Sequence, residues 1–444
     1  MVNEIMSETL KPEPAALAKR TQLDAIGERL SAILAQGEQG AVDAVDQILQ
    51  TAADLRASDI HFEPWEEAVS LRYRLDGLLH DVARLPKAHQ ERLVARIKVL
   101  ARMAVYHKHA PQDGRIDPDR SRCGCAFRVA AFPTIYGEKV SLRLLGEQDR
   151  PLSLNELGLS QPVTDTLRRL AGRASGVLLL TGPSSSGKTT TIYALLRALM
   201  ADRETPPHVV TIEDPVEYRL GNVAQTQIGP PTELTFATAL RSLLRQDPEV
   251  IVVGEIRDAE TAHMAIQAGL TGHLVISTIH CGTAAGVFTR LLDMGVEQFL
   301  VASSVAGVLA QRLVRRVCEA CAAPYTPGPH LLSAFSLSAE GGYRRGQGCL
   351  ACQGCLACQG IGYKGRTALG ELLLVDDALS EAVLARKRTR ALHGVAMDSG
   401  MRPLLLDGLD KARGGVTTVE EILRVLPPEV KQPEREERDD GRHE

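Results

Sequence analysis

The run of residues with the clearest chemistry lies near the middle of the 444-residue chain and could cradle a phosphate chain. It fits the pattern G-x-x-x-x-G-K-[ST], with one more threonine behind it, and consists of Gly182, Pro183, Ser184, Ser185, Ser186, Gly187, Lys188, Thr189 and Thr190. In such a loop the glycines let backbone N–H groups close around phosphate oxygens, the lysine reaches the β- and γ-phosphates, and the last hydroxyl meets Mg²⁺. We therefore expect Lys188 to hold ATP and Thr189 to hold its Mg²⁺.

A nucleotide site of this kind also needs an acid at the end of a neighbouring strand. Residues 250–253 form an apolar run that Gly254 and Glu255 follow, with glutamate where aspartate is commoner. A carboxylate there can hold a Mg²⁺-bound water or orient the attacking water, and the alternative is an ordinary acid at a strand end. A further acidic group begins at Glu213, after the apolar run 208–212. Taken alone, that group fits a solvated turn as well as a site.

Six of the nine cysteines form three Cys-x-x-Cys pairs within one segment. Two such pairs in succession have the spacing of a tetrahedral structural Zn²⁺ site, and an odd total argues against a disulfide scaffold. The first pair is Cys318 and Cys321. The sequence GCLACQ then occurs twice in direct succession and offers two candidates for the second pair, Cys349 with Cys352 or Cys355 with Cys358. Four thiolates complete a site, so one pair is surplus.

The elements around these residues alternate between apolar strands and helices. Four strands are expected, at 176–180, 208–212, 250–253 and 273–277, with a helix at 190–200 directly after the phosphate loop. This order is typical of a mostly parallel sheet flanked by helices. Alternating apolar residues at 69–73 and 140–144, with helical periodicity at 93–104, predict a smaller α+β domain before it.

We divide the chain into six parts on this basis. They are a short helical segment (1–41), an N-terminal α+β domain (42–150), an ATPase core (151–310), a zinc-binding module (311–370), a C-terminal helical part of the ATPase domain (371–426) and a charged, disordered tail (427–444). Apolar residues recur at helical spacing near the end, where residues 417–421 supply capping-box spacings.

Composition excludes several classes of protein. Hydrophobic residues make up 44% of the chain and charged residues 24%, as in ordinary globular domains. A net charge of -4 with 4% aromatic residues argues against a nucleic-acid motor, which would need a basic channel with aromatic stacking residues. The N-terminus lacks a signal-peptide pattern, and no apolar run approaches the ~20 residues of a membrane helix. We therefore expect a cytoplasmic protein whose membrane work goes through partners.

Seven motifs together resemble one family, the ATPases of type II secretion and type IV pilus assembly. Besides the phosphate loop they are TIEDPVEY at 211–218, LLRQDPEVIVVGEIRD at 243–258, a histidine segment at 271–280, ASDIHFEP at 57–64, RYRLDG at 72–77 and PQDGR at 111–115. The similarity runs from about residue 42 to 426. The resemblance implies an α/β fold, with a RecA-like P-loop ATPase domain, a smaller N-terminal α+β (PAS-like) domain and a four-cysteine zinc module.

The resemblance also implies roles for individual residues. It implies a homohexameric ring in which the small domain of one subunit closes over the nucleotide of another. Glu255, Lys188 and Glu213 join a catalytic set with arginines that surround the phosphates, namely Arg115 and Arg128 from the N-terminal domain and Arg241 and Arg245 before Glu255. Arginines there would stabilise the charge that grows on the γ-phosphoryl group. His273 and His280 would sense the γ-phosphate, and the alternative for each is a core histidine.

In the family, the second cysteine pair is followed closely by G-Y-x-G-R, which here occupies 362–366. Cys355 and Cys358 have that register, so the resemblance favours them, with Cys318 and Cys321, as the zinc ligands. Assembly members carry this module and retraction members usually lack it. The stretch before residue 57 is shorter than the docking domain that assembly members usually carry. The implied partners are an inner-membrane platform protein and a bitopic docking protein, with no direct contact to nucleic acid.

These patterns predict a cytoplasmic ATPase, peripherally associated with the inner membrane, that couples ATP binding and hydrolysis to type II protein secretion or to assembly of pilin-like fibres. The alternative is a type IV pilus assembly or DNA-uptake pilus ATPase rather than a secretion ATPase. A retraction motor and a nucleic-acid motor are the least favoured interpretations. An inactive scaffold is disfavoured because Lys188, Thr189 and Glu255 are all present.

Overall fold

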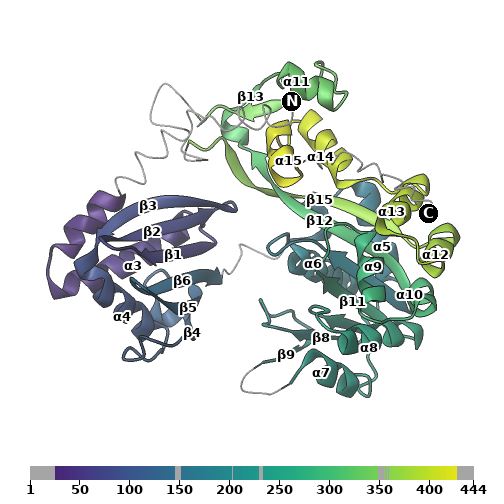
Figure 1. Ribbon diagram of the computed structural model, residues 1–444, viewed down its shortest axis with the longest axis horizontal. Helices are drawn as coiled ribbons and strands as arrows, with labels where there is room; N and C mark the ends of the chain where they lie inside the picture. The colour runs from purple at the N-terminus through teal and green to yellow at the C-terminus, as the bar shows by residue number, and fades with distance from the viewer. Residues whose placement is uncertain are drawn as a thin grey trace, which may run out of the picture.

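The computed structural model describes residues 26–145, 152–202, 204–229, 234–348, 355, 358 and 360–427. Residues 1–25, residues 146–151 around the expected domain boundary at 150, the alternative pair Cys349 and Cys352, and the tail from 428 onward lie outside the described residues. The described chain forms two bodies, each built on its own sheet (Figure 1). None of the described helices combines the length and the apolar composition needed to cross a bilayer.

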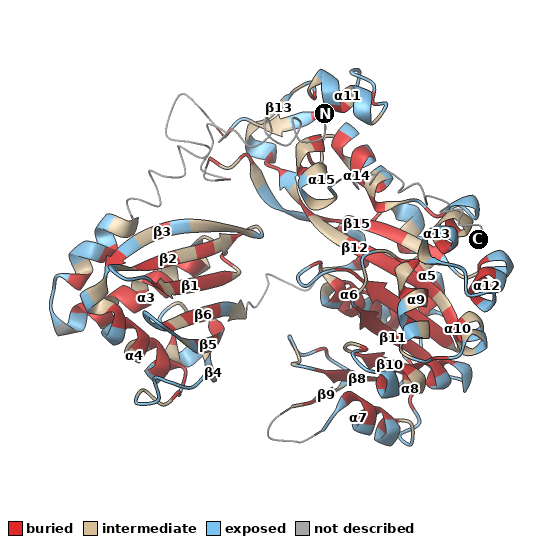
Figure 2. Cartoon of the chain, in the orientation of Figure 1, coloured by how far each residue is buried: buried red, intermediate tan, exposed pale blue. Residues whose placement is uncertain are grey.

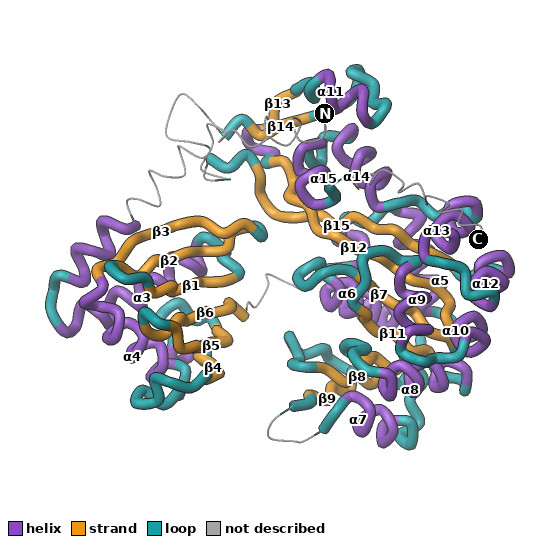
Figure 3. Tube along the Cα trace, viewed as in Figure 1, coloured by secondary structure: helices purple, strands orange, loops and turns teal. Residues whose placement is uncertain are grey.

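The N-terminal body is an antiparallel sheet of six strands in the order β3-β2-β1-β6-β5-β4. The strands are β1 (Asp59–Pro64), β2 (Ala68–Leu75), β3 (Leu78–Pro86), β4 (Gln112–Ile116), β5 (Ala126–Thr134) and β6 (Gly137–Leu145). Two helices, α3 (Glu38–Asp54) and α4 (Gln90–Leu100), pack on one face of this sheet (Figure 3).

The two faces of the N-terminal sheet differ because successive strand residues point to opposite sides. Along β1, Ile60 and Phe62 are buried in one core with the apolar residues of α3 and α4. Asp59, His61 and Glu63 alternate with them and therefore stand on the other face. The alternation of apolar and polar residues that predicts strands in this part of the chain thus separates a helix-covered face from a charged one.

The second body contains a seven-stranded sheet in the order β15-β12-β7-β11-β10-β8-β9. Its strands are β7 (Gly176–Thr181), β8 (Val209–Glu213), β9 (Ala224–Gln227), β10 (Val250–Val253), β11 (Leu274–Ile279), β12 (Val305–Val317) and β15 (Tyr363–Leu374). The helices around it are α5 (Gln161–Ala171), α6 (Lys188–Ala201), α7 (Phe236–Leu243), α8 (Ala259–Leu270), α9 (Gly286–Asp293) and α10 (Gln298–Ser304). All neighbouring strands are parallel except β12 and β15, so the predicted α/β class is confirmed.

Burial on both faces explains why the central strands are continuously apolar. Val177 and Leu179 of β7 belong to the core beneath one layer of helices, whereas Leu178 and Leu180 belong to the core on the other side. Figure 2 shows these central strands as buried along their length. A parallel strand covered on both faces has no solvent side, so the polar alternation seen in the N-terminal sheet is absent here.

The longest strand, β12, crosses residue 310, where the sequence suggested a domain boundary, and continues with β15 as an antiparallel ribbon. At the far end of the ribbon lie β13 (Ala322–Pro324), β14 (Arg344–Gly346) and α11 (Pro329–Ala334). The C-terminal stretch predicted to be helical forms α12 (Asp377–Leu384), α13 (Thr389–Asp398), α14 (Leu404–Arg413) and α15 (Val419–Val425). Thr418 caps α15, because its side chain accepts a hydrogen bond from the backbone N–H of Glu421.

A buried carboxylate ties α15 to β12. Glu421 accepts hydrogen bonds from the backbone N–H and the guanidinium of Arg315, at 2.7–3.0 Å, and from Arg424 at 2.7 Å. Burial opposes ionisation of Glu421, but the hydrogen bonds from Arg424 and Arg315 outweigh it and lower the pKa of this carboxyl. Arg315 also lies 4.1 Å from the ring centre of Tyr363.

Replacement Glu421→Gln should lower the free energy of unfolding by about 3 kcal/mol, because the largely buried guanidinium of Arg315 loses the charge that compensates its burial. Urea denaturation at neutral pH measures the change. The contribution of Glu421 should be present above the ordinary carboxyl pKa and disappear as the pH falls through its lowered value. Glu319→Gln, which removes an exposed pair with Arg316, is the control and should cost less than about 1 kcal/mol. Equal effects of the two replacements would contradict this assignment.

Candidate active site

The phosphate loop connects β7 to α6 at the carboxyl edge of the parallel strands. Gly182 and Gly187 have φ angles of 147° and 89°, in the region that favours glycine. A Cβ at Gly182 would lie 2.5 Å from the carbonyl oxygen of Gln311, so no side chain fits there. The Oγ of Ser186 is buried and has no hydrogen-bond partner among the described residues. A glycine-built loop with an orphaned hydroxyl, before a helix that begins at Lys188, fits a bound phosphate chain.

Gln311 of β12 holds the loop in place through two side-chain hydrogen bonds. None of the sequence motifs includes this residue. Its Nε2 donates to the carbonyl of Ser186 at 2.8 Å, and its Oε1 accepts from the hydroxyl of Thr191 at 2.8 Å. One buried amide therefore links the loop, the first turn of α6 and the neighbouring strand. The only signal in the sequence is a polar residue that follows the apolar run 305–310.

A cavity of about 240 Å³, here called the phosphate cavity, opens on one side of the loop. Lys188 and Thr189 line it together with Glu255, which follows β10. The Nζ of Lys188 donates to the carbonyls of Gly182 and Pro183, at 2.9 and 3.0 Å. Burial lowers the pKa of Lys188, whereas the carboxylate of Glu255 acts in the opposite direction. The arrangement holds a cation and an acid on either side of one small space.

Glu255 has two further neighbours. One of its oxygens lies 3.4 Å from Nε2 of His280, and the other accepts a hydrogen bond from Arg257. His280 lines the phosphate cavity and follows β11, so adjacent strands deliver the acid and the imidazole to one place. Arg257 is also 3.7 Å from the carboxylate of Asp214, which lines the same cavity.

Glu213 ends β8 at the wall of the phosphate cavity, and it is buried rather than part of a solvated turn. Its oxygens accept hydrogen bonds from the hydroxyl of Thr211 at 2.6 Å, from Gln225 at 3.1 Å and from the hydroxyl of Tyr193. Burial, with the hydrogen bond to Glu213, raises the pKa of Tyr193 far above its usual range. Neutral hydrogen-bond donors therefore fix the orientation of the Glu213 carboxylate.

The two histidines of the histidine segment lie at opposite ends of β11. His273 precedes the strand, and its Nδ1 lies 3.2 Å from the carbonyl oxygen of Ala268. Seven residues at about 3.3 Å each separate it from His280 by roughly 20 Å. His280 alone reaches the phosphate cavity of its own chain.

The four arginines that the resemblance implied lie outside this cavity in the single chain. Arg115 of β4 pairs with Asp117 at 3.4 Å. Arg128 stands opposite it on β5. Arg241 pairs with an exposed glutamate at 2.7 Å, and Arg245 donates to the carbonyl of Arg241 at 3.1 Å. Thr190, in the first turn of α6, lines neither cavity described here.

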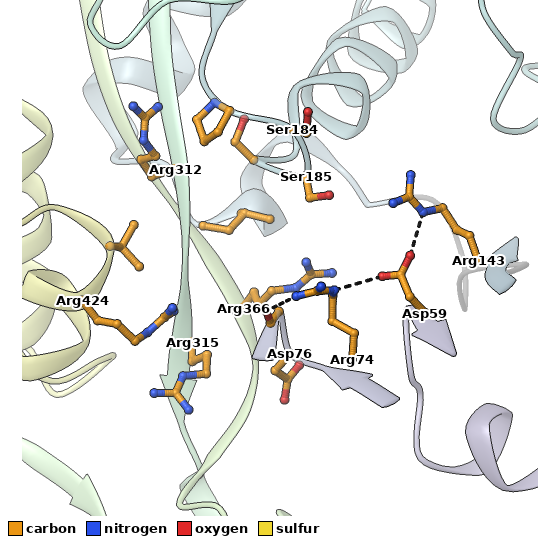
Figure 4. A pocket seen from close by; sticks show the side chains of 15 residues that line it. Asp59, Arg74, Asp76, Arg143, Ser184, Ser185, Arg312, Arg315, Arg366 and Arg424 are labelled. Atoms are coloured by element: carbon orange, nitrogen blue, oxygen red, sulfur yellow. Dashed lines mark hydrogen bonds and ion pairs between the residues drawn. The ribbon is translucent and has the colours of Figure 1, made fainter. Parts of the chain in front are cut away.

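A second cavity of about 480 Å³, here called the arginine cavity, lies on the other side of the loop, between the two bodies (Figure 4). Residues 183–186 form one wall, and the N-terminal sheet supplies Asp59, Arg74 and Arg143. The remaining cations come from the β12–β15 ribbon and α15, namely Arg312, Arg315, Arg366 and Arg424. The sequence analysis assigned none of them to a site, although Asp59, Arg74 and Arg366 stand inside the motifs it identified.

Four cysteines converge at the far end of the β12–β15 ribbon. The Sγ atoms of Cys318, Cys321, Cys355 and Cys358 all lie within 4.8 Å of one another. The Sγ atoms of Cys318 and Cys355 are 4.0 Å apart, and those of Cys321 and Cys358 are 3.7 Å apart. A tetrahedral ion with metal–sulfur bonds of 2.3 Å needs about 3.8 Å between sulfurs. Burial raises the pKa of Cys358 to about 12, so a cation would be needed to keep this cluster ionised.

Comparison with known proteins gives matches over most of the chain. A family model described as "Type II/IV secretion system protein" matches residues 35–424. The chain is 43% identical over 388 residues to the type II secretion system ATPase E of Vibrio cholerae, covering 86% of this chain and 75% of that protein. It is 43% identical over 403 residues to the type II secretion system protein HxcR of Pseudomonas aeruginosa, covering 91% and 81%. It is 41% identical over 418 residues to the type IV pilus assembly ATPase PilB of Thermus thermophilus, covering 93% and 46%.

Two solved structures resemble the fold. The ATPase DotB of Legionella pneumophila has a TM-score of 0.62 at 21% identity and covers 85% of this chain and 93% of its own. The pilus retraction motor PilT, solved with bound ADP, has a TM-score of 0.58 at 24% identity and covers 88% and 98%. At these identities the likeness concerns the fold alone, and it agrees with the predicted arrangement of a RecA-like ATPase body with a smaller α+β body.

Replacement Gln311→Leu keeps the volume of the side chain but leaves the Ser186 carbonyl and the Thr191 hydroxyl without their partner. We expect a loss of about 1–3 kcal/mol in the free energy of unfolding, the usual penalty for such buried groups. Urea denaturation of the chain without nucleotide measures it. The control Gln298→Leu removes only exposed hydrogen bonds to Arg386 and should be nearly neutral. A neutral Gln311→Leu would show that the loop needs no brace.

Proposed function

The chain belongs to the type II/IV secretion system protein family, and from this premise we propose that it is the motor of a type II secretion machine. It is an ATP hydrolase of the family that drives secretion and pilus assembly, and it uses a nucleotide with Mg²⁺. The observation that carries the proposal is the convergence of Lys188, Thr189 and Glu255 on one cavity. Assembly of type IV pilus fibres is the second candidate, because PilB matches 93% of this chain at nearly the same identity.

In the proposed reaction, Lys188 exchanges the carbonyls of Gly182 and Pro183 for the β- and γ-phosphate oxygens of ATP. Mg²⁺, held through Thr189, would supply compensation for the phosphate charge. Glu255 orients the attacking water towards the γ-phosphorus. His280 and Arg257 fix the two oxygens of Glu255, so that the carboxylate keeps one direction during attack.

We further propose that the chain works as a homohexamer and that Arg115, Arg128, Arg241 and Arg245 act at a nucleotide across a subunit boundary. Exposure supports this part of the proposal: the side chains of Arg115 and Arg241 are 64% and 56% exposed and pair only with acids that are themselves accessible. Arginines in such positions stabilise charge on the transferred phosphoryl group. A platform protein and a docking protein of the inner membrane are the proposed partners, which would hold the ring at the membrane.

Replacement Glu255→Gln should lower kcat for ATP hydrolysis by about 10²-fold or more, because the water loses its orienting charge, while nucleotide binding persists. Lys188→Ala should lose both binding and turnover. Phosphate release by the oligomeric fraction and binding of a fluorescent ATP analogue measure the two effects. Glu249→Gln, at the other end of the same strand, is the control and should retain wild-type turnover. Full activity of Lys188→Ala would defeat the proposal.

We also propose that Cys318, Cys321, Cys355 and Cys358 hold a structural Zn²⁺. The ion would link the end of β12 to the segment that precedes β15. Its binding would contribute on the order of ten kcal/mol to local folding. The distances between the sulfurs and their burial support this set. No catalytic role is proposed for it, since the cluster belongs to neither cavity beside the loop.

Purified protein should contain one zinc per chain, measured by elemental analysis. Cys358→Ser should lose the metal and lower the melting temperature, because three thiolates leave the tetrahedron open. The double replacement Cys349→Ser with Cys352→Ser is the matched control and should keep both metal and stability. Loss of zinc from the control, with retention in Cys358→Ser, would assign the site to the other pair.

A further inference from the structure

One row of charges crosses the open face of the N-terminal sheet. The strand register places Arg115 opposite Arg128, Arg128 opposite Arg143, Arg143 opposite Asp59, and Asp59 opposite Arg74. Directly opposed residues of neighbouring strands lie about 4.5–5.5 Å apart at their Cβ atoms, so like charges in such a row repel one another. The row contains four arginines and a single acid, so the repulsion among the arginines is only partly compensated within the row.

Asp59 is the fixed point of this row. Its Oδ1 accepts a hydrogen bond from Nε of Arg143 at 3.0 Å, and its Oδ2 lies 3.4 Å from Nε of Arg74. The Ser58 hydroxyl donates to the same Oδ2 at 2.9 Å. The side chain of Asp59 is only 12% exposed, whereas that of Arg143 is 64% exposed. The carboxylate of Asp59 is therefore less exposed than the guanidinium groups of Arg143 and Arg74, and it contacts the Nε atom of each.

The guanidinium of Arg143 lies across the arginine cavity from the phosphate loop, whereas Nη1 of Arg74 already donates to the carbonyl of Gly77 at 3.0 Å. In Figure 4, Arg143, Asp59 and Arg74 stand across the arginine cavity from Ser184 and Ser185 of the same chain. Six arginines line this cavity against two aspartates, so its surplus charge favours an anion. Arg315 and Arg424 share the single negative charge of Glu421, and Arg143 and Arg74 share that of Asp59, so each pair keeps a net positive charge that can act on a ligand.

The influence of Arg143 also reaches the phosphate cavity. Burial raises the pKa of Glu217, which lines that cavity, and the charges of Arg143 and Arg128 act in the opposite direction. Arg143 and Arg128 thus also act electrostatically on an acid of the phosphate cavity. An anion that is bound to the loop and extends past Ser184 and Ser185 would come within its field.

We propose that Asp59 is a positioning residue that aims Arg143 and Arg74 at the phosphates of ATP bound to the loop of the same chain. Asp59 keeps the Nε of Arg143, while the terminal nitrogens of the guanidinium donate to the phosphate oxygens. Through this contact the N-terminal sheet distinguishes an occupied loop from an empty one. The inference rests on the proposed ATPase function and adds a residue pair that the four implied arginines do not include.

The test replaces Asp59 by asparagine. Asp59→Asn should lower kcat about tenfold or more, because Arg143 and Arg74 lose their aim. The affinity for a fluorescent ATP analogue should not weaken, since the cavity loses a negative charge, and its dependence on salt should become steeper. A merely structural role would instead weaken binding and turnover together with the melting temperature.

Glu63→Gln is a matched control on the same strand and the same face. Glu63 also bridges cations of β2 and β6, through Arg72 at 3.0 Å and Lys139 at 2.8 Å, and its side chain is 15% exposed. It does not line the arginine cavity. Its replacement should leave kcat within about twofold of wild type, because neither Glu63 nor its partners Arg72 and Lys139 line the arginine cavity.

Arg143→Gln provides a second route to the same answer if Asp59→Asn proves unstable, because Arg143 is exposed and should not be needed for folding. It should reproduce most of the loss in kcat, and Asp59→Asn added to it should lower kcat less than it does in the wild type, because only Arg74 then remains for Asp59 to position. Equal kcat for Asp59→Asn and Glu63→Gln, in an active wild type, would overturn the inference and leave the proposed function standing. A wild type without ATP turnover would overturn the proposed function, and the inference with it.

Discussion

The close approach of the phosphate loop to β12 is the constraint on which the rest of the site depends. Only glycine fits at Gly182, because the carbonyl of Gln311 occupies the place of a side chain. The same residue then holds Ser186 and Thr191 through its amide. The loop is therefore fixed against a central strand rather than suspended from its two ends. This contact lets the acids that follow β8 and β10 and the arginines of β12 take defined positions on either side of one backbone.

The charges on the two sides of the loop are opposite in sign. The phosphate cavity collects carboxylates, including Glu213, Glu217 and Glu255, whereas the arginine cavity collects guanidinium groups. A magnesium nucleotide has the matching polarity, since the metal needs oxygen ligands and the phosphates need donors. The two bodies divide this work, because the acids come from the second body alone and the N-terminal sheet contributes arginines with Asp59.

Local sequence predicts much of this fold, because burial leaves different patterns in the two sheets. Both faces of β7 are covered, so its apolar run is continuous, while β2 and β6 have one charged face and alternate. The phosphate loop and Glu255 can be predicted for the same reason, since each follows an apolar strand directly. Cys355 and Cys358 required more than spacing, because an identical pair precedes them, and the family register selected the pair that the structure brings to Cys318 and Cys321.

The remaining features depend on contacts between segments far apart in the chain. Asp59 meets Arg143 across 84 positions through the register of β1 with β6, which no local pattern specifies. His273 and His280 share one motif, yet a strand between them separates their side chains to opposite edges of the sheet. Two residues of one motif therefore lie at the same end of a sheet only if no complete strand lies between them.

The continuity of β12 gives the molecule a mechanical element. Gln311, which holds the loop, lies in the middle of its 13 residues, and the stretch from Gln311 to Cys318 spans about 23 Å at the usual rise per residue. Pairing with β15 doubles the strand and stiffens it along most of that length. Each degree by which the ribbon tilts about Gln311 displaces the cluster by about 0.4 Å, from that length. A tilt of the backbone beside the phosphates is therefore carried along the paired strands to a surface remote from the nucleotide.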